Sequence, residues 1–66
     1  MTARRTKWTL AAYNRGGATV AQTVFSLRHL HEWARLEVIA AHTDSYRERW
    51  VAERDASAEA IRSLTT

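Results

Sequence analysis

The feature that most constrains this chain is its lack of residues that interrupt regular backbone structure. Proline is absent, and the only two glycines are the adjacent Gly16 and Gly17. Alanine, leucine, arginine and glutamate, which are good helix formers, are abundant. A chain with so few turn signals and so many helix formers is expected to be all-α. We therefore predict helices on both sides of the glycine pair.

The segment before the glycine pair combines a short apolar stretch with basic residues. Residues 8–13 are apolar enough for one or two helical turns, and a glycine that follows can adopt the left-handed conformation that ends a helix. No acidic residue precedes Gly16. Residues 1–17 are therefore expected to form a basic arm with a short helix or turn. A β-hairpin through the glycines is the alternative, because the residues that follow them have some strand preference.

The central helix is predicted to begin at a capping box and to carry two apolar stripes. Thr19 precedes Gln22 by three residues, a spacing at which both side chains satisfy free backbone donors, so we expect a helix over residues 19–42. On a 3.6-residue period, the first stripe, which His31 interrupts, consists of Val20, Val24, Leu27, Leu30, Ala34, Val38 and Ala41. The second stripe, on roughly the opposite side, consists of Ala21, Phe25, Trp33, Leu36, Ile39 and Ala40.

A second long helix is predicted to follow after a short connection. Ser45 and Glu48 repeat the capping-box spacing, which predicts a helix over residues 45–64. Its single packing stripe, which Glu53 and Ser57 share, consists of Tyr46, Trp50, Ala60, Ile61 and Leu64. Helices joined by few residues usually lie antiparallel, so we expect a helical hairpin. One continuous helix over residues 20–64 is the alternative, because no glycine or proline enforces the turn.

The small size of the chain makes the second stripe of the central helix important. The 66 residues form one expected domain without cysteine, so neither disulfides nor a cysteine-built metal site stabilises it. If the C-terminal helix covers the first stripe, the second stripe needs another cover, and we predict an oligomeric or partner-bound protein. The predicted interface residues are Phe25, Trp33, Leu36, Ile39 and Trp50. The alternative is a three-element monomer, completed by Trp8, Leu10 and Tyr13.

The residues that could carry chemistry do not form a recognisable catalytic or metal-binding pattern. His29, His31, Glu32 and His42 are ligand types, but the two nearest histidines point in different directions on a helix. We interpret His31 and His42 as polar breaks in an apolar face and His29 as a surface residue. Ser26 and His29 lack a third orienting group, and no phosphate-binding loop is present. We expect no enzyme, no cofactor, no metal and no small-molecule substrate.

The basic arm is the second predicted contact surface. Cations pair with phosphates or acidic side chains, and aromatic rings can stack on bases. The residues predicted to contact a nucleic acid or an acidic partner are Arg4, Arg5, Lys7, Trp8 and Arg15. Four cations give weak affinity unless several copies act together, so this alternative takes the form of a nucleic-acid-binding helical dimer.

Taken together, these patterns favour a non-enzymatic protein-binding module that docks an apolar helix face on a protein partner or on itself. Its expected role is that of a regulator, adaptor or inhibitor. Nine of the ten basic residues are arginine, a bias typical of GC-rich coding, which suggests a high-GC bacterium or its phage, and a phage or mobile element could encode such a regulator. No apolar run approaches the roughly 18 to 20 residues of a membrane span, and no signal-peptide segment is recognisable. We expect a cytoplasmic protein that does not act on membranes.

Overall fold

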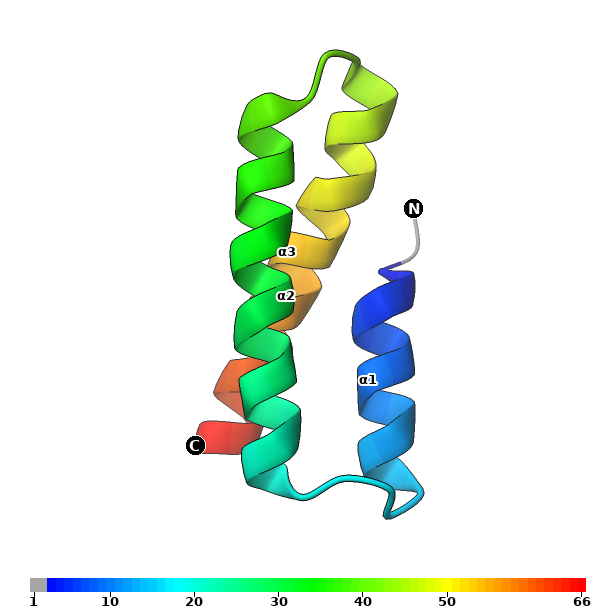
Figure 1. Ribbon diagram of the computed structural model, residues 1–66, viewed down its shortest axis with the longest axis vertical. Coiled ribbons are helices and arrows are strands. Elements are labelled where there is room, and N and C mark those ends of the chain that lie inside the picture. Colours follow the sequence, from blue (N-terminus) through cyan, green and yellow to red (C-terminus); the bar gives the residue numbers. More distant parts are fainter. Residues whose placement is uncertain (1–2) are drawn as a thin grey trace.

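The computed structural model describes residues 3–66, which form three helices: α1 (Arg4–Asn14), α2 (Val20–Ala40) and α3 (Asp44–Thr65). Figure 1 shows α2 and α3 as an antiparallel hairpin, with α3 crossing behind α2 and α1 running beside them. The described residues contain no strand, so the all-α prediction is confirmed and the β-hairpin alternative is wrong. The first two residues of the predicted arm lie outside the described residues.

The glycine pair ends α1 in the way that the sequence predicts. Gly16 has a positive φ of 79°, which L side chains rarely adopt. Its backbone N–H donates to the carbonyl of Tyr13 at 3.0 Å, and that of Gly17 donates to the carbonyl of Ala12 at 2.8 Å. These two bonds define a Schellman motif, which satisfies the last carbonyls of the helix and turns the chain back toward α2.

The predicted capping box at the start of α2 is confirmed. The backbone N–H of Gln22 donates to the Thr19 hydroxyl at 3.1 Å, and the Thr19 N–H donates to the Gln22 side-chain oxygen at 2.9 Å. Two of the free donors at this helix end are therefore satisfied locally, which fixes where α2 begins.

The start of α3 differs from the prediction. The N-cap is Thr43, whose hydroxyl accepts a hydrogen bond from the backbone N–H of Tyr46 at 3.2 Å, and Ser45 already lies within the helix. The predicted cap at Ser45 with Glu48 is therefore wrong. Both Thr43 and Ser45 are residue types that cap helices, and the extended backbone at Thr43 decides between them. The break at residues 41–43 also excludes a single continuous helix.

The core lies between α2 and α3 and is small. Leu27, Leu30 and Ala34 of the first stripe are buried, and Leu30 and Ala34 pack with Trp50 of α3. The buried face of α3 consists of Trp50, Glu53, Ser57 and Ala60. Of the predicted packing stripe, Trp50 and Ala60 are buried together with its polar members Glu53 and Ser57. Ile61 and Leu64 are half-buried, and Tyr46 is exposed. Among residues 3–66, no helix combines the length and the apolar character that a membrane crossing requires.

Candidate protein-interaction site

A buried carboxylate of α3 holds the N-terminus of α1. Glu53 is 4% exposed, and its carboxylate accepts from the backbone N–H groups of Arg5 at 2.8 Å and Thr6 at 3.1 Å. The Thr6 hydroxyl donates to the same carboxylate at 3.1 Å. The N-cap residue of α1, Ala3, provides no side-chain cap, so Glu53 provides it from another helix. A buried charge is tolerated when it is hydrogen bonded, and a helix N-terminus stabilises an anion.

Arg5 stacks on two tryptophans at the contact between the three helices. Its guanidinium carbon lies 4.5 Å from the ring centroid of Trp33 and 5.5 Å from that of Trp50. The two indole rings are tilted, with centroids 4.8 Å apart. Arg5 is therefore engaged within the molecule, through a cation–π contact at its side chain and a hydrogen bond from its backbone.

Two residues that the sequence assigned to contact surfaces, Trp50 and Arg5, are instead held within the molecule. Trp50 is 5% exposed and belongs to the core, as its place on the packing stripe predicts, so it is not part of the exposed docking surface. It holds the hairpin together because it packs against Leu30 and Ala34. Arg5 is more a structural residue of the α1–α2–α3 contact than a free cation of the basic arm.

Trp33 is fixed in place but remains partly open to solvent. Its indole N–H donates to one carboxylate oxygen of Glu37 at 3.0 Å, and the hydroxyl of Tyr46 donates to the other at 3.1 Å. These bonds orient the ring from α2 and α3 at once. With 43% of its surface exposed, Trp33 presents a rigid aromatic face to the outside. A rigid, half-exposed tryptophan is well suited to an interface, because little side-chain entropy is lost when a partner covers it.

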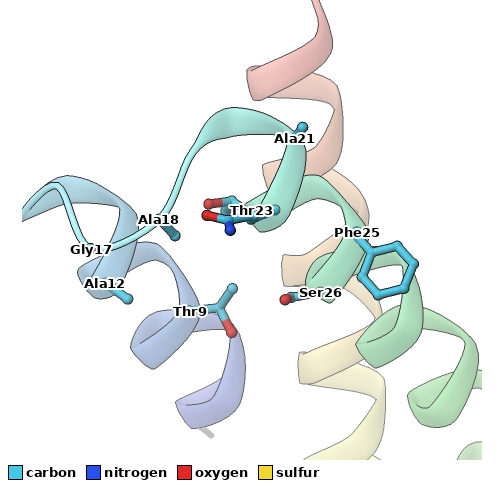
Figure 2. A pocket seen from close by; sticks show the side chains of 9 residues that line it. Thr9, Ala12, Gly17, Ala18, Ala21, Thr23, Phe25 and Ser26 are labelled. Atoms are coloured by element: carbon cyan, nitrogen blue, oxygen red, sulfur yellow. The ribbon is translucent and has the colours of Figure 1, made fainter.

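A groove separates α1 from the exposed side of α2, and we call it the α1/α2 groove. Its first part, shown in Figure 2, is a hollow of about 690 Å³ near the glycine turn. Thr9 of α1 and Ser26 of α2 lie on facing sides of this hollow, and Phe25 stands beside it. The residues that line it are mostly small: Thr9, Ala12, Gly17, Ala18, Ala21, Gln22, Thr23, Phe25 and Ser26. Short side chains leave space between the two helices.

The groove continues toward the aromatic cluster. A second hollow of about 460 Å³ shares Thr9, Phe25 and Ser26 with the first and extends to Trp8 and Trp33. Three aromatic rings therefore lie along one groove: Phe25 is 65% exposed and Trp8 63%, and both are more open than Trp33. Phe25 also packs on the ring of His29, with centroids 4.3 Å apart. The structure thus joins one predicted arm residue to two predicted interface residues.

The remaining predicted interface residues extend the apolar surface along α2. Leu36 is 52% exposed and Ile39 71% exposed. On a helical period they lie on the same side of α2 as Phe25, because they follow it by 11 and 14 residues. Docking of α1 therefore leaves this face of α2 open.

The other predicted arm residues lie on α1 or directly after it. Arg4, Lys7, Trp8 and Arg15 are exposed, and their spacing places them on one side of the helix. The guanidinium of Arg4 lies 6.0 Å from the Trp8 ring centroid. Within residues 3–66, none of these three cations forms an ion pair with a carboxylate. The predicted basic arm is thus an ordered helix with one basic face.

The acidic residues of α2 are engaged in local contacts. Glu32 pairs with Arg35 at 2.7 Å on the exposed side of the helix. Hydrogen bonding to Arg35 and the charge of its guanidinium lower the pKa of Glu32, and the same contact raises the pKa of Arg35. Glu37 accepts from Trp33 and Tyr46, as described above. Arg35 thus offsets the charge of Glu32, whereas Glu37 keeps its charge, and neither carboxylate lines the α1/α2 groove.

The histidines are dispersed over the molecule. Nδ1 of His31 lies 3.1 Å from the carbonyl oxygen of Arg54 and 3.3 Å from the hydroxyl of Ser57, so His31 is a polar member of the α2–α3 interface. His29 and His42 are exposed. In the described part of the chain, no three histidine, cysteine or acidic side chains lie close enough together to hold a metal ion.

Two features of this site escaped the sequence analysis. The first is the capping of α1 by Glu53, which lies 48 and 47 positions after its partners Arg5 and Thr6. The place of Glu53 on an apolar stripe was the one available signal, because a charge there needs hydrogen-bond partners. The groove depends on Thr9 and Ser26 facing each other across two helices, and only the docked arrangement of α1 reveals this.

Comparison with known proteins identifies no relative. No protein-family model, no curated protein and no solved structure matches the chain. The function must therefore be inferred from the surface that the three helices form.

Proposed function

We propose that this chain is a small, non-enzymatic protein-binding module, which docks on a protein partner through the α1/α2 groove and the adjoining face of α2. Such a module would act as a regulator, adaptor or inhibitor of the protein that it binds. The observation that carries the proposal is the exposure of Phe25, Leu36 and Ile39 by more than half, although α1 has already docked on the hairpin.

The balance of buried and exposed side chains supports this proposal. The large apolar residues of the core are Leu27, Leu30 and Trp50. The exposed large apolar residues are more numerous: Trp8, Val20, Phe25, Trp33, Leu36, Ile39 and Tyr46. Full burial of one such side chain contributes about 1.5–3 kcal/mol. A partner that covers three or four of them therefore adds a free energy comparable to the whole stability of a small domain, roughly 5 kcal/mol.

The alternative, a three-element monomer that covers its own apolar residues, accounts for only part of the apolar surface. Docking of α1 partly buries Leu10 and Tyr13, as that alternative requires, but Trp8 stays 63% exposed. This docking leaves Phe25 and Ile39 open, so intramolecular packing does not account for the second stripe. Exposed apolar surface of this extent usually marks an interface.

A selection from a random peptide library displayed on phage tests this function. We expect peptides that bind the full chain and the Val20→Ser variant but lose binding to a Phe25→Ser/Ile39→Ser double variant. Val20 is the matched control, because it is an exposed apolar residue of α2 outside the second stripe. Circular dichroism should show equal helicity for all three proteins. If selected peptides bind the double variant as well as the wild type, the proposed surface is wrong.

A second candidate function, nucleic-acid binding, is favoured by the exposed cations of α1 and its C-cap. Arg4, Lys7 and Arg15 share one face with Trp8, and α1 contains no acidic residue. Cations and an exposed ring on one surface can contact phosphates and stack on a base, most effectively in a dimer that presents two such faces. A gel-shift titration tests it. Binding should weaken steeply with salt and disappear in a Lys7→Gln/Arg15→Gln variant, and no shift at low salt would eliminate this candidate.

A further inference from the structure

We infer that the occupant of the α1/α2 groove is an acidic amphipathic helix supplied by a partner protein. This inference rests on the proposed function and adds the chemistry of the partner. Three properties of the groove lead to it: its shape, the side chains along it and the charge of the helices that form it.

The shape of the groove suits a helix. Its two hollows together follow α2 from Ala21 to Trp33. At a rise of 1.5 Å per residue, this distance is about 18 Å, or roughly three turns of a bound helix. The first hollow is lined mainly by small side chains, so the backbone of a bound helix can approach closely there, whereas the second hollow is lined by larger side chains, including Trp8 and Trp33. Binding of an amphipathic helix in an apolar groove is a recurring mode of recognition, in which a few apolar anchors supply most of the affinity.

The side chains along the groove provide contacts for such anchors. Trp8 of α1 and Phe25 of α2 are the two most exposed rings beside it, and Trp33 closes the end near Arg5. A large apolar side chain of the partner placed between these rings would contact Thr9 and Ser26 beneath them. Aromatic residues surrounding a desolvated pocket are typical positions of high binding energy.

The charge distribution selects an acidic helix over a basic one. Between Arg4 and Ala40 the chain has six cations and two carboxylates, whereas residues 41–66 have four cations and five carboxylates. The two carboxylates of α2 are Glu32 and Glu37, and both are engaged in local contacts. Within residues 3–66, Arg4 and Arg28 form no ion pair. The groove is therefore formed by the two helices that carry the net positive charge.

The same distribution disfavours a second copy as the occupant. Two copies that packed through this face would bring the cations of both α1 and α2 together at one interface. Like charges placed across an interface cost free energy and slow association, whereas complementary charges speed it and select the correct partner. An acidic flank on a foreign helix would instead meet Arg5, which lines the second hollow, and reach Arg4 and Arg28 on the same two helices.

Three synthetic peptides of about 18 residues, or five helical turns, test the inference directly. The first is an amphipathic helix with leucine on its apolar face and glutamate on its polar face. The second has lysine at the polar positions, and the third has the composition of the first in a scrambled order that is not amphipathic. Each carries a fluorescein label, and fluorescence anisotropy gives its affinity for the full chain. We expect the acidic amphipathic peptide to bind at least about 10-fold more tightly than either control, an affinity ratio typical of one hot-spot contact.

Variants of the chain locate the binding site. Phe25→Ser should weaken the acidic peptide by about 10-fold or more through loss of an apolar anchor. Arg4→Gln/Arg28→Gln should weaken it and reduce its salt dependence. The matched controls are Val20→Ser on α2 and Arg62→Gln on α3, where Arg62 pairs with Glu59 away from the groove. Both controls should bind like the wild type.

Each contrary result overturns the inference in a distinguishable way. Equal affinity for the acidic and lysine peptides would reject the choice of charge while leaving protein binding intact. Equal affinity for the scrambled peptide would show simple charge attraction without a helix in the groove. Self-association that Phe25→Ser abolishes would identify a second copy as the occupant. Duplex DNA that displaces the bound peptide would assign the surface to nucleic acid. Failure of both these peptides and the random library would reject the proposed function itself.

Discussion

At the scale of single residues, Glu53 links the third helix to the first. Its carboxylate accepts hydrogen bonds from α1 while its own backbone belongs to α3, so one buried side chain sets the position of the helix that forms one wall of the α1/α2 groove. A charged side chain on an apolar stripe is usually a cost, and here the free donors of a helix N-terminus offset it.

Replacement of Glu53 by alanine should therefore destabilise the protein. We expect a loss of about 2 kcal/mol in the free energy of unfolding, because the donors of Arg5 and Thr6 lose a charged acceptor in a buried setting. Urea titration followed by circular dichroism measures this loss. Glu48→Ala is the control, since Glu48 is exposed on the same helix and should change stability by less than about 0.5 kcal/mol. Equal effects of the two substitutions would contradict the capping role.

Trp50 is the largest residue of the core and has one unusual feature. Its indole N–H is buried and finds no hydrogen-bond partner in the described part of the chain. Trp50→Ala should cost about 3–5 kcal/mol, which approaches the whole stability of a domain of this size, so we expect loss of helicity. Trp50→Phe should remain folded, because it keeps an aromatic ring and removes the unpaired donor. Thermal unfolding compares the two, and an unfolded Trp50→Phe protein would contradict this account.

At the scale of the helices, capping decides where each element begins. The cap of α3 lies at Thr43, two residues before the residue that the capping-box spacing selects. The same spacing at Thr19 and Gln22 identifies the start of α2 correctly. In this chain, the capping-box spacing identifies the helix start where one capping residue is present, and it misplaces the start where Thr43 and Ser45 lie close together.

Alanine substitutions at the two candidate caps distinguish them. Thr43→Ala should lower the free energy of unfolding by about 1 kcal/mol, because the Tyr46 N–H loses its acceptor. Ser45→Ala should leave stability unchanged or slightly higher, since this residue lies within the helix, where alanine is preferred. Urea titration of both variants measures the difference. A larger loss for Ser45→Ala would place the cap where the sequence pattern predicted it.

Local patterns predicted much of the fold because the physics behind them is local. The glycine cap of α1, the capping box of α2 and the buried stripe with Leu27, Leu30 and Ala34 each depend on residues a few positions apart. The docking of α1 depends on Glu53, nearly 50 positions away, and periodicity carries no information about such a contact. The same limit explains Trp50: periodicity placed it on the packing stripe of α3, but only the three-dimensional contact with Leu30 and Ala34 shows that it is buried and not part of the docking surface.

At the scale of the whole molecule, the open face of α2 has a consequence for its oligomeric state. Because the α1 and α2 cations would meet in a symmetric pair, we expect the free chain to remain a 7.6 kDa monomer from micromolar to near-millimolar concentrations. Sedimentation equilibrium at several concentrations measures this directly. A stable dimer that dissociates in the Phe25→Ser variant would show that the open face serves self-association.

A nuclear magnetic resonance titration tests whether the α1/α2 side of the molecule is its binding surface. The ¹⁵N-labelled full chain is titrated with the acidic amphipathic peptide, and the change in each backbone and indole N–H signal is mapped on the three helices. We expect the largest changes at Trp8, Phe25, His29 and Trp33, and no change on the outer face of α3. Changes concentrated on α3, around Asp55 and Glu59, would contradict this expectation.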